Sequence, residues 1–185
     1  MDSINLMMEE HKYIKRMLVV VRNACIGILD GNDIDFQDFQ DMITFIRKYA
    51  DAHHHGKEEN MLFNRMIEEI GGAAEKLVRH GMLVEHDMGR LFVKELEEAL
   101  EKVKNGDSSA KVDVIANAVG YANLLNRHID KEDKVVYTFA KRELSSSVME
   151  KINKECESFE TEKEADKIQQ SYIKLLENLE NKYIK

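Results

Sequence analysis

The chain has 185 residues, no proline and only nine glycines, and its 27 basic and 35 acidic residues give a formal charge of −8. This negative charge argues against an extended nucleic-acid interface, and no stretch approaches the roughly 20 apolar residues that cross a bilayer. The first residues also lack a basic region followed by an apolar one. We therefore expect a cytoplasmic protein that binds neither nucleic acid nor membrane.

Helix-forming residues recur with a period near 3.6 along the chain, which predicts an all-α protein. Asp2 or Ser3 is expected to cap the first helix, and glycines or serines to end each of the four. The predicted helices cover about residues 3–31, 35–71, 73–104 and 109–144. Short turns between helices of similar length favour an up-down-up-down antiparallel four-helix bundle over residues 1–145.

Residues 146–185 are rich in charge, helical by pattern and free of histidine. They are expected to form a C-terminal helical extension that packs on the bundle or joins copies of the chain into a homo-oligomer. The extension should lie outside any site built from histidines. Cys25 and Cys156 are far apart in the sequence and are expected to be reduced thiols.

The most unusual stretch is HHHGKEE at positions 53–59. His54 with Glu58 and His55 with Glu59 both have i,i+4 spacing, which places each pair on one face of an α-helix. The stripe of His55 and Glu59 carries mostly apolar neighbours: Phe45, Tyr49, Ala52, Leu62 and Met66. This favours His55 and Glu59 as the inward pair and predicts that His53 and His54 face solvent or support the site from behind.

The other three helices carry similar groups on their apolar stripes. His11 lies on the first helix, His86 on the third, and His128 with Glu132 on the fourth, again at i,i+4 spacing. The separations are 75 residues from His11 to His86 and 73 from His55 to His128, which indicates two similar helical hairpins. The six groups expected to meet at the bundle centre are His11, His55, Glu59, His86, His128 and Glu132.

Four imidazoles and two carboxylates from four helices fit a dinuclear metal site in which Glu59 and Glu132 bridge the ions. Nitrogen and oxygen ligands without thiolate favour iron or manganese over tetrahedral structural zinc. Without a metal, burying these groups would cost several kcal/mol for each unpaired charge. Tyr121 shares the face of His128, where it either packs in the core or supplies a hydroxyl to the metals.

As a set, these motifs resemble the hemerythrin family, and specifically its bacterial HHE cation-binding branch. The resemblance covers about residues 1–144. It is carried by Glu10-His11, His55-Gly56-Lys57-Glu58-Glu59, Glu85-His86 with Arg90, and His128-Ile129-Asp130-Lys131-Glu132-Asp133. It implies a non-haem site of two iron ions joined by an oxo or hydroxo group, with manganese or zinc as possible substitutes. The implied ligands are small oxidants: dioxygen, peroxide or nitric oxide.

Two departures from the family pattern bear on the function. Oxygen-carrying members use five histidines, two of them in an H-x-x-x-H pair on the third helix, whereas Met82 and Arg90 lie four residues from His86 here. One metal should then keep an open position, which favours redox processing of a small oxidant with electrons from an unidentified donor. The alternative is a non-enzymatic module that binds oxygen, senses it or stores iron. In the fourth helix the parallel with Glu59 favours Glu132 over Asp133 as the bridge.

Overall fold

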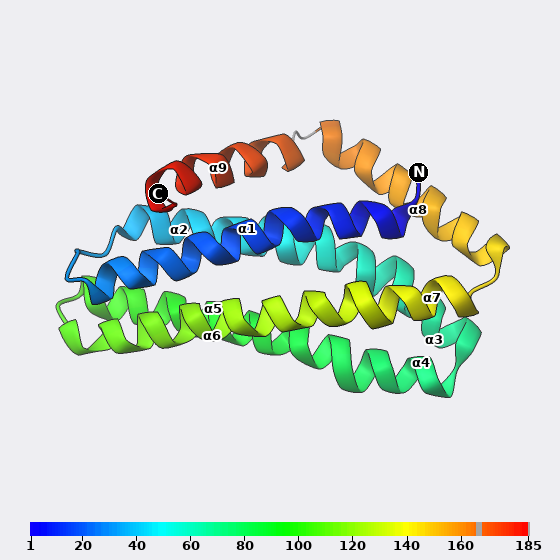
Figure 1. The fold of residues 1–185 in the computed structure, drawn as a ribbon, viewed down its shortest axis with the longest axis horizontal. Coiled ribbons are helices and arrows are strands. Elements are labelled where there is room, and N and C mark those ends of the chain that lie inside the picture. The colour runs from blue at the N-terminus through cyan, green and yellow to red at the C-terminus, as the bar shows by residue number, and fades with distance from the viewer. Residues whose placement is uncertain (166–167, 185) are drawn as a thin grey trace.

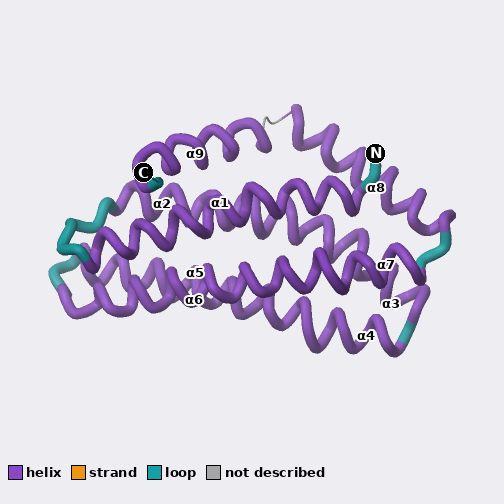
Figure 2. Tube along the Cα trace, in the orientation of Figure 1, coloured by secondary structure: helices purple, strands orange, loops and turns teal. Residues whose placement is uncertain are grey.

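The computed structural model describes residues 1–165 and 168–184, and every regular element within these ranges is helical. Four long helical runs lie side by side as a bundle, and two further helices lie along one side of it (Figure 1). Most loops and turns lie at the two ends of the bundle (Figure 2). The prediction of an all-α bundle is confirmed.

The first run is α1 (Ser3–Leu29), and the second joins α2 (Phe36–Phe45), the π-helical segments η1 (Ile46–His55) and η2 (Glu58–Phe63), and α3 (Asn64–Ile70). The third joins α4 (Gly72–Leu77), the π-helical η3 (Val78–Met82) and α5 (Leu83–Lys104). The fourth joins the 3₁₀ turn η4 (Ser108–Ala110), α6 (Lys111–Lys131), the π-helical η5 (Glu132–Val136) and α7 (Tyr137–Glu143). The extension contributes α8 (Ser146–Ala165) and α9 (Ile168–Tyr183), and its residues 166–167 and 185 lie outside the described ranges.

Local sequence explains where the runs begin and end. The Asp2 carboxylate accepts a hydrogen bond from the backbone N of Asn5 at 3.0 Å, and Asp35 caps α2 in the same way. Gly31 and Gly71 follow the first two runs with φ of 92° and 76°, in the left-handed region that glycine enters without a Cβ clash. These limits agree with those predicted from the sequence.

The second, third and fourth runs change from α- to π-helix within their length. A π-helix forms i→i+5 hydrogen bonds and turns less per residue than an α-helix, so side chains beyond it leave the α-helical phase. In the fourth run, for example, Val135 is 53% exposed, whereas Val136 is buried.

Two apolar clusters fill the bundle on either side of a layer of buried polar residues. Ile14 and Leu125 belong to one cluster, and Ile4 and Phe63 belong to the other. The layer between them contains buried histidines and glutamates from all four runs. Apolar packing above and below therefore keeps these polar groups away from water.

The extension packs closely on the bundle. Ile152 and Cys156 of α8 are fully buried in one apolar cluster, and Leu176 of α9 is fully buried in the other. The Arg16 guanidinium adds a two-pronged ion pair with the Glu180 carboxylate, at 2.8 and 2.6 Å. The extension is thus part of the folded molecule over its described residues.

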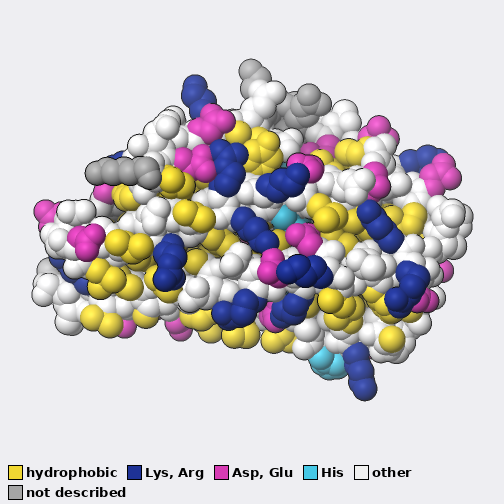
Figure 3. All heavy atoms as spheres, in the orientation of Figure 1, with side chains coloured by type: hydrophobic (Ala, Val, Ile, Leu, Met, Phe, Trp, Pro, Cys, Tyr) yellow, Lys and Arg dark blue, Asp and Glu magenta, His cyan; other side chains and the backbone are white. Residues whose placement is uncertain are grey.

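The outer surface carries mixed charge. Figure 3 shows basic and acidic side chains interspersed among apolar ones on one face of the molecule. Within the described ranges, no helix combines the length and the apolar character that a membrane span requires. Cys25 and Cys156 are both buried free thiols.

Candidate metal centre

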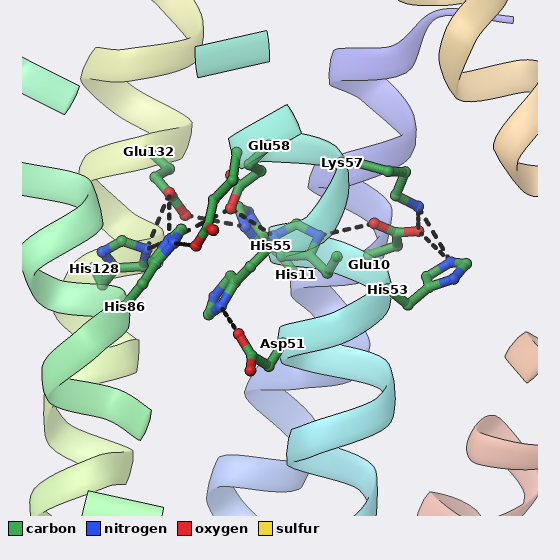
Figure 4. A network of polar contacts seen from close by, with 12 residues as sticks. Glu10, His11, Asp51, His53, His55, Lys57, Glu58, His86, His128 and Glu132 are labelled. Atoms are coloured by element: carbon green, nitrogen blue, oxygen red, sulfur yellow. Dashed lines mark hydrogen bonds and ion pairs between the residues drawn. The ribbon is translucent and has the colours of Figure 1, made fainter. Parts of the chain in front are cut away.

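Seven buried side chains meet in the polar layer and form two groups that share Glu58 (Figure 4). The first group is His55, Glu58, His86 and His128, and the second is His11, His54, Glu58 and Glu132. Within each group, the candidate ligand atoms lie within 4.8 Å of one another. Each group can therefore hold one metal ion.

The two glutamates lie between the imidazoles of the two groups. Glu132 Oε1 is 3.0 Å from Nε2 of His128, and Glu132 Oε2 is 3.3 Å from Nε2 of His11. Glu58 Oε2 is 3.6 Å from Nε2 of His54 and 3.6 Å from Nε2 of His86. Both carboxylates thus lie within reach of imidazoles from both groups.

Each of the five imidazoles has a carboxylate oxygen at hydrogen-bonding distance from its Nδ1. The pairs are His11–Asp133 (2.7 Å), His54–Glu10 (2.8 Å), His55–Asp51 (3.3 Å), His86–Glu59 (2.6 Å) and His128–Glu85 (2.8 Å). An ionised carboxylate can only accept, so Nδ1 donates to it, and in the neutral imidazole Nε2 is left with a lone pair. This support from behind is characteristic of histidines that bind a metal through Nε2.

Several atoms that face the centre form no hydrogen bond within the described chain. Nε2 of His11, Nε2 of His54, Glu58 Oε2 and both Glu132 oxygens are buried without a hydrogen bond. In addition, Nε2 of His86 lies 3.0 Å from Nε2 of His128. Lone pairs that face one another in a buried site are costly unless a cation lies between them. The donor set therefore fits metal ions.

Burial and neighbouring charges set the protonation of the centre. Burial lowers the pKa of His54 to about 4, so this imidazole is a neutral ligand at pH 7. Burial also opposes a charge on His11, but the hydrogen bond with Asp133 and the nearby Glu132 carboxylate raise its pKa to about 9. Burial and the nearby Glu132 charge raise the pKa of Glu58 well above its usual value. Without metal, protons on His11 and Glu58 therefore compensate for part of the missing positive charge.

The structure brings five of the six residues predicted from the sequence into these groups: His11, His55, His86, His128 and Glu132. Glu59 lies outside both groups. Its side chain is 26% exposed, and its Oε1 lies 2.6 Å from Nδ1 of His86 and 2.7 Å from the Arg90 guanidinium. Glu58 occupies the place expected for Glu59.

Of the two alternatives expected for His53 and His54, exposure to solvent is wrong, because both are buried. That expectation assumed an unbroken α-helix, whereas η1 and η2 are π-helical and change the direction of successive side chains. Both His54 and His55 therefore reach the centre. A fifth imidazole is thus present, supplied by the second run and not by the third.

Tyr137 is a functional candidate that the sequence analysis did not identify. Its hydroxyl donates a hydrogen bond to Glu58 Oε1 at 2.5 Å, and its ring stacks on His11 with centroids 5.6 Å apart. Tyr137 follows Glu132 by five residues, a spacing that the π-helical η5 keeps on one face. Tyr121, considered from the sequence, instead lines a cavity next to the centre.

This cavity has a volume of about 300 Å³ and reaches His55 and His86. Its other lining residues are Ile46, Arg47, Asp51, Gly89, Arg90, Val93 and Tyr121. Arg90 is partly exposed and contacts both Asp51 and Glu59 at 2.7 Å. The cavity thus leads from a charged rim to two imidazoles of the centre.

A buried set of histidines and carboxylates in the core of a helical bundle is the arrangement with which bundle proteins hold metal ions. The family model of the hemerythrin HHE cation-binding domain matches residues 2–140, and the chain belongs to this family. Searches of curated proteins and of solved structures gave no match. The family and the two groups of ligands together define a cation-binding helical domain.

Proposed function

We propose that this chain is a non-haem di-iron protein that binds and redox-processes a small oxidant: dioxygen, peroxide or nitric oxide. The observation that carries the proposal is the set of unpaired nitrogen and oxygen atoms that face one another in the buried layer. The proposed ligands are His11, His54, His55, Glu58, His86, His128 and Glu132. Glu58 and Glu132 are the proposed bridges.

The ligand types support iron over structural zinc. Each position has imidazole and carboxylate ligands, no thiolate, and at least four protein ligands when both glutamates bridge. The position at His11 and His54 has one imidazole fewer than the other, so it is the proposed place for a small ligand. A pair of iron ions supplies one electron from each ion to an oxidant, which requires an external electron donor for turnover.

The surrounding residues orient Glu58 and limit the access of water to the site. Tyr137 holds Glu58 Oε1 by its hydroxyl proton and leaves Oε2 directed at the imidazoles. Burial raises the pKa of Tyr137 well above its usual value, so the hydroxyl keeps its proton. The apolar clusters exclude water from most sides, and the cavity at His55 and His86 reaches the other metal position.

The second candidate function is a non-enzymatic module that binds or senses oxygen, or stores iron. The fifth imidazole, His54, favours it because oxygen-carrying relatives also use five histidines. In either function we take residues 1–145 as an up-down-up-down bundle, residues 146–185 as its extension with a possible role in homo-oligomers, and the protein as cytoplasmic.

Steady-state kinetics separate the two functions. Iron-loaded, reduced protein is mixed with hydrogen peroxide and excess reductant, and separately with dioxygen alone. Continuous peroxide consumption supports redox processing. Reversible oxygen binding without turnover supports the module, and failure to react with either oxidant contradicts both.

A further inference from the structure

Next to the centre lies a second buried cluster of charge. The Lys57 ammonium is fully buried and forms ion pairs with Glu10 and Glu160. Lys57 Nζ is also 3.2 Å from Nε2 of His53, which lies 3.1 Å from Glu160 Oε1 (Figure 4 shows Lys57, Glu10 and His53). Glu160 belongs to α8, beyond residues 2–140 that match the family.

One carboxylate connects this cluster to the centre. Glu10 Oε1 pairs with Lys57, and Glu10 Oε2 lies 2.8 Å from Nδ1 of His54. The charge available on Glu10 thus affects how strongly it holds the His54 proton. A stronger acceptor at Nδ1 makes the opposite nitrogen a more basic metal ligand.

The other half of the bundle contains an equivalent arrangement without the extension. Lys131 pairs with Glu85 Oε1, and Glu85 Oε2 lies 2.8 Å from Nδ1 of His128. Lys131 is 46% exposed, and Glu85 is its only ion-pair partner in the part of the chain that the structure describes. Lys57 differs by its complete burial and by the second carboxylate, Glu160. The arrangement at His128 therefore serves as an internal control for the effect of α8 on His54.

We propose that Glu160 is a positioning residue through which the C-terminal extension tunes one metal position. Glu160 shares the positive charge of Lys57, so Glu10 keeps more of its acceptor strength for the Nδ1 proton of His54. The metal position at His11 and His54 binds more tightly as a result. This inference rests on the proposed metal centre. It also changes the expectation that the extension takes no part in the site.

The extension does not need Glu160 in order to fold. Ile152 and Cys156 already anchor α8 in an apolar cluster, and the Ser3 backbone N and hydroxyl both donate to Asn153 Oδ1, at 2.9 and 2.8 Å. Glu160→Gln keeps the size of the side chain and removes its charge. Glu157→Gln is the matched control, because Glu157 is exposed on the same helix.

The test uses Zn²⁺ as a diamagnetic probe in the full chain. Calorimetry gives the two binding constants, and proton NMR gives the Nδ1–H resonances of His54 and His128. E160Q is expected to weaken one zinc equivalent by about three- to tenfold, which is less than the about 10- to 100-fold typical of removing a direct partner. It should also shift the His54 resonance upfield and leave that of His128 unchanged, while E157Q matches the wild type.

Equal zinc affinities and equal His54 resonances in E160Q and E157Q would overturn the proposal. If E160Q does not fold, as judged by thermal unfolding, the same measurements are made on Glu160→Asn, which also removes the charge, on a shorter side chain. A weakened second equivalent with a shifted His54 signal then supports the proposal, and wild-type values overturn it. Wild-type protein that binds fewer than two zinc ions would instead refute the metal centre itself.

Discussion

Glu59 Oε1 lies 2.6 Å from Nδ1 of His86, which makes this glutamate a support for the imidazole and not a group at the centre. Its neighbour Glu58 lies at the opposite edge of the same ring, with Oε2 3.6 Å from Nε2. Two consecutive glutamates thus contact the two nitrogens of one imidazole. Their substitutions should have different consequences.

Glu58→Gln should remove most of the bound metal from both positions, because Glu58 is shared by the two groups. Glu59→Gln should weaken metal binding by about 10- to 100-fold, as expected when a hydrogen-bond partner of a ligand is lost. Metal content after gel filtration measures both effects. Metal-free E59Q beside fully loaded E58Q would show that the two roles are reversed.

His54→Ala should lose metal and the thermal stabilisation that metal provides, because binding to the folded state alone raises stability. His80→Ala is the control, since His80 is exposed and lies outside both groups. Thermal unfolding with and without added iron gives the result. A metal-dependent rise in Tm that is as large in H54A as in H80A would exclude His54 as a ligand.

Metal binding at pH 7 should release a proton from His11, whose pKa of about 9 keeps the metal-free imidazole charged. Metal affinity should therefore rise with pH up to about 9 and then level off. The same raised pKa of His11 stabilises the folded, metal-free protein. This contribution is fully present when the pH is below about 6.5, the pKa of an unfolded histidine, and it is lost as the pH rises through 9. Metal affinity should thus rise with pH, whereas the stability that His11 gives to the metal-free protein should fall.

Calorimetry in two buffers of different ionisation enthalpy measures the protons released on metal binding. At least one proton per chain is expected at pH 7, and fewer at pH 10. The same enthalpy in both buffers at pH 7 would mean that His11 is already neutral before the metal binds.

Both cysteines should react slowly with iodoacetamide in the native protein. Burial raises the pKa of Cys25 and of Cys156 to about 11, so little thiolate is present at pH 8. Mass spectrometry should find two alkylated residues in urea and almost none in the native state. Rapid native labelling of Cys156 would indicate that α8 opens from the bundle.

Most of the fold could be predicted from the sequence because its signals are local. Asp2 and Asp35 cap their helices, Gly31 and Gly71 end them, and regular apolar stripes mark the buried faces. His11 was placed correctly on such a stripe, in an uninterrupted α-helix. The errors begin where helices become π-helical, because the phase there depends on tertiary packing.

Part of the correct register was present in the sequence. Lys57-Glu58-Glu59 aligns with Lys131-Glu132-Asp133 at a constant separation of 74 residues, and the same separation pairs His54 with His128. This alignment would have selected Glu58 over Glu59. It contains no signal for Tyr137 or Glu160, whose positions depend on the π-helical η5 and on the packing of α8.

The most direct test of the di-iron centre is elemental analysis of iron-reconstituted protein, with visible absorption recorded before and after anaerobic reduction and again after exposure to air. Two irons per chain, with ferric absorption that bleaches on reduction and returns in air, is the expected result. A single zinc per chain that iron does not replace, with no change in the spectrum, would contradict a di-iron centre at these seven residues.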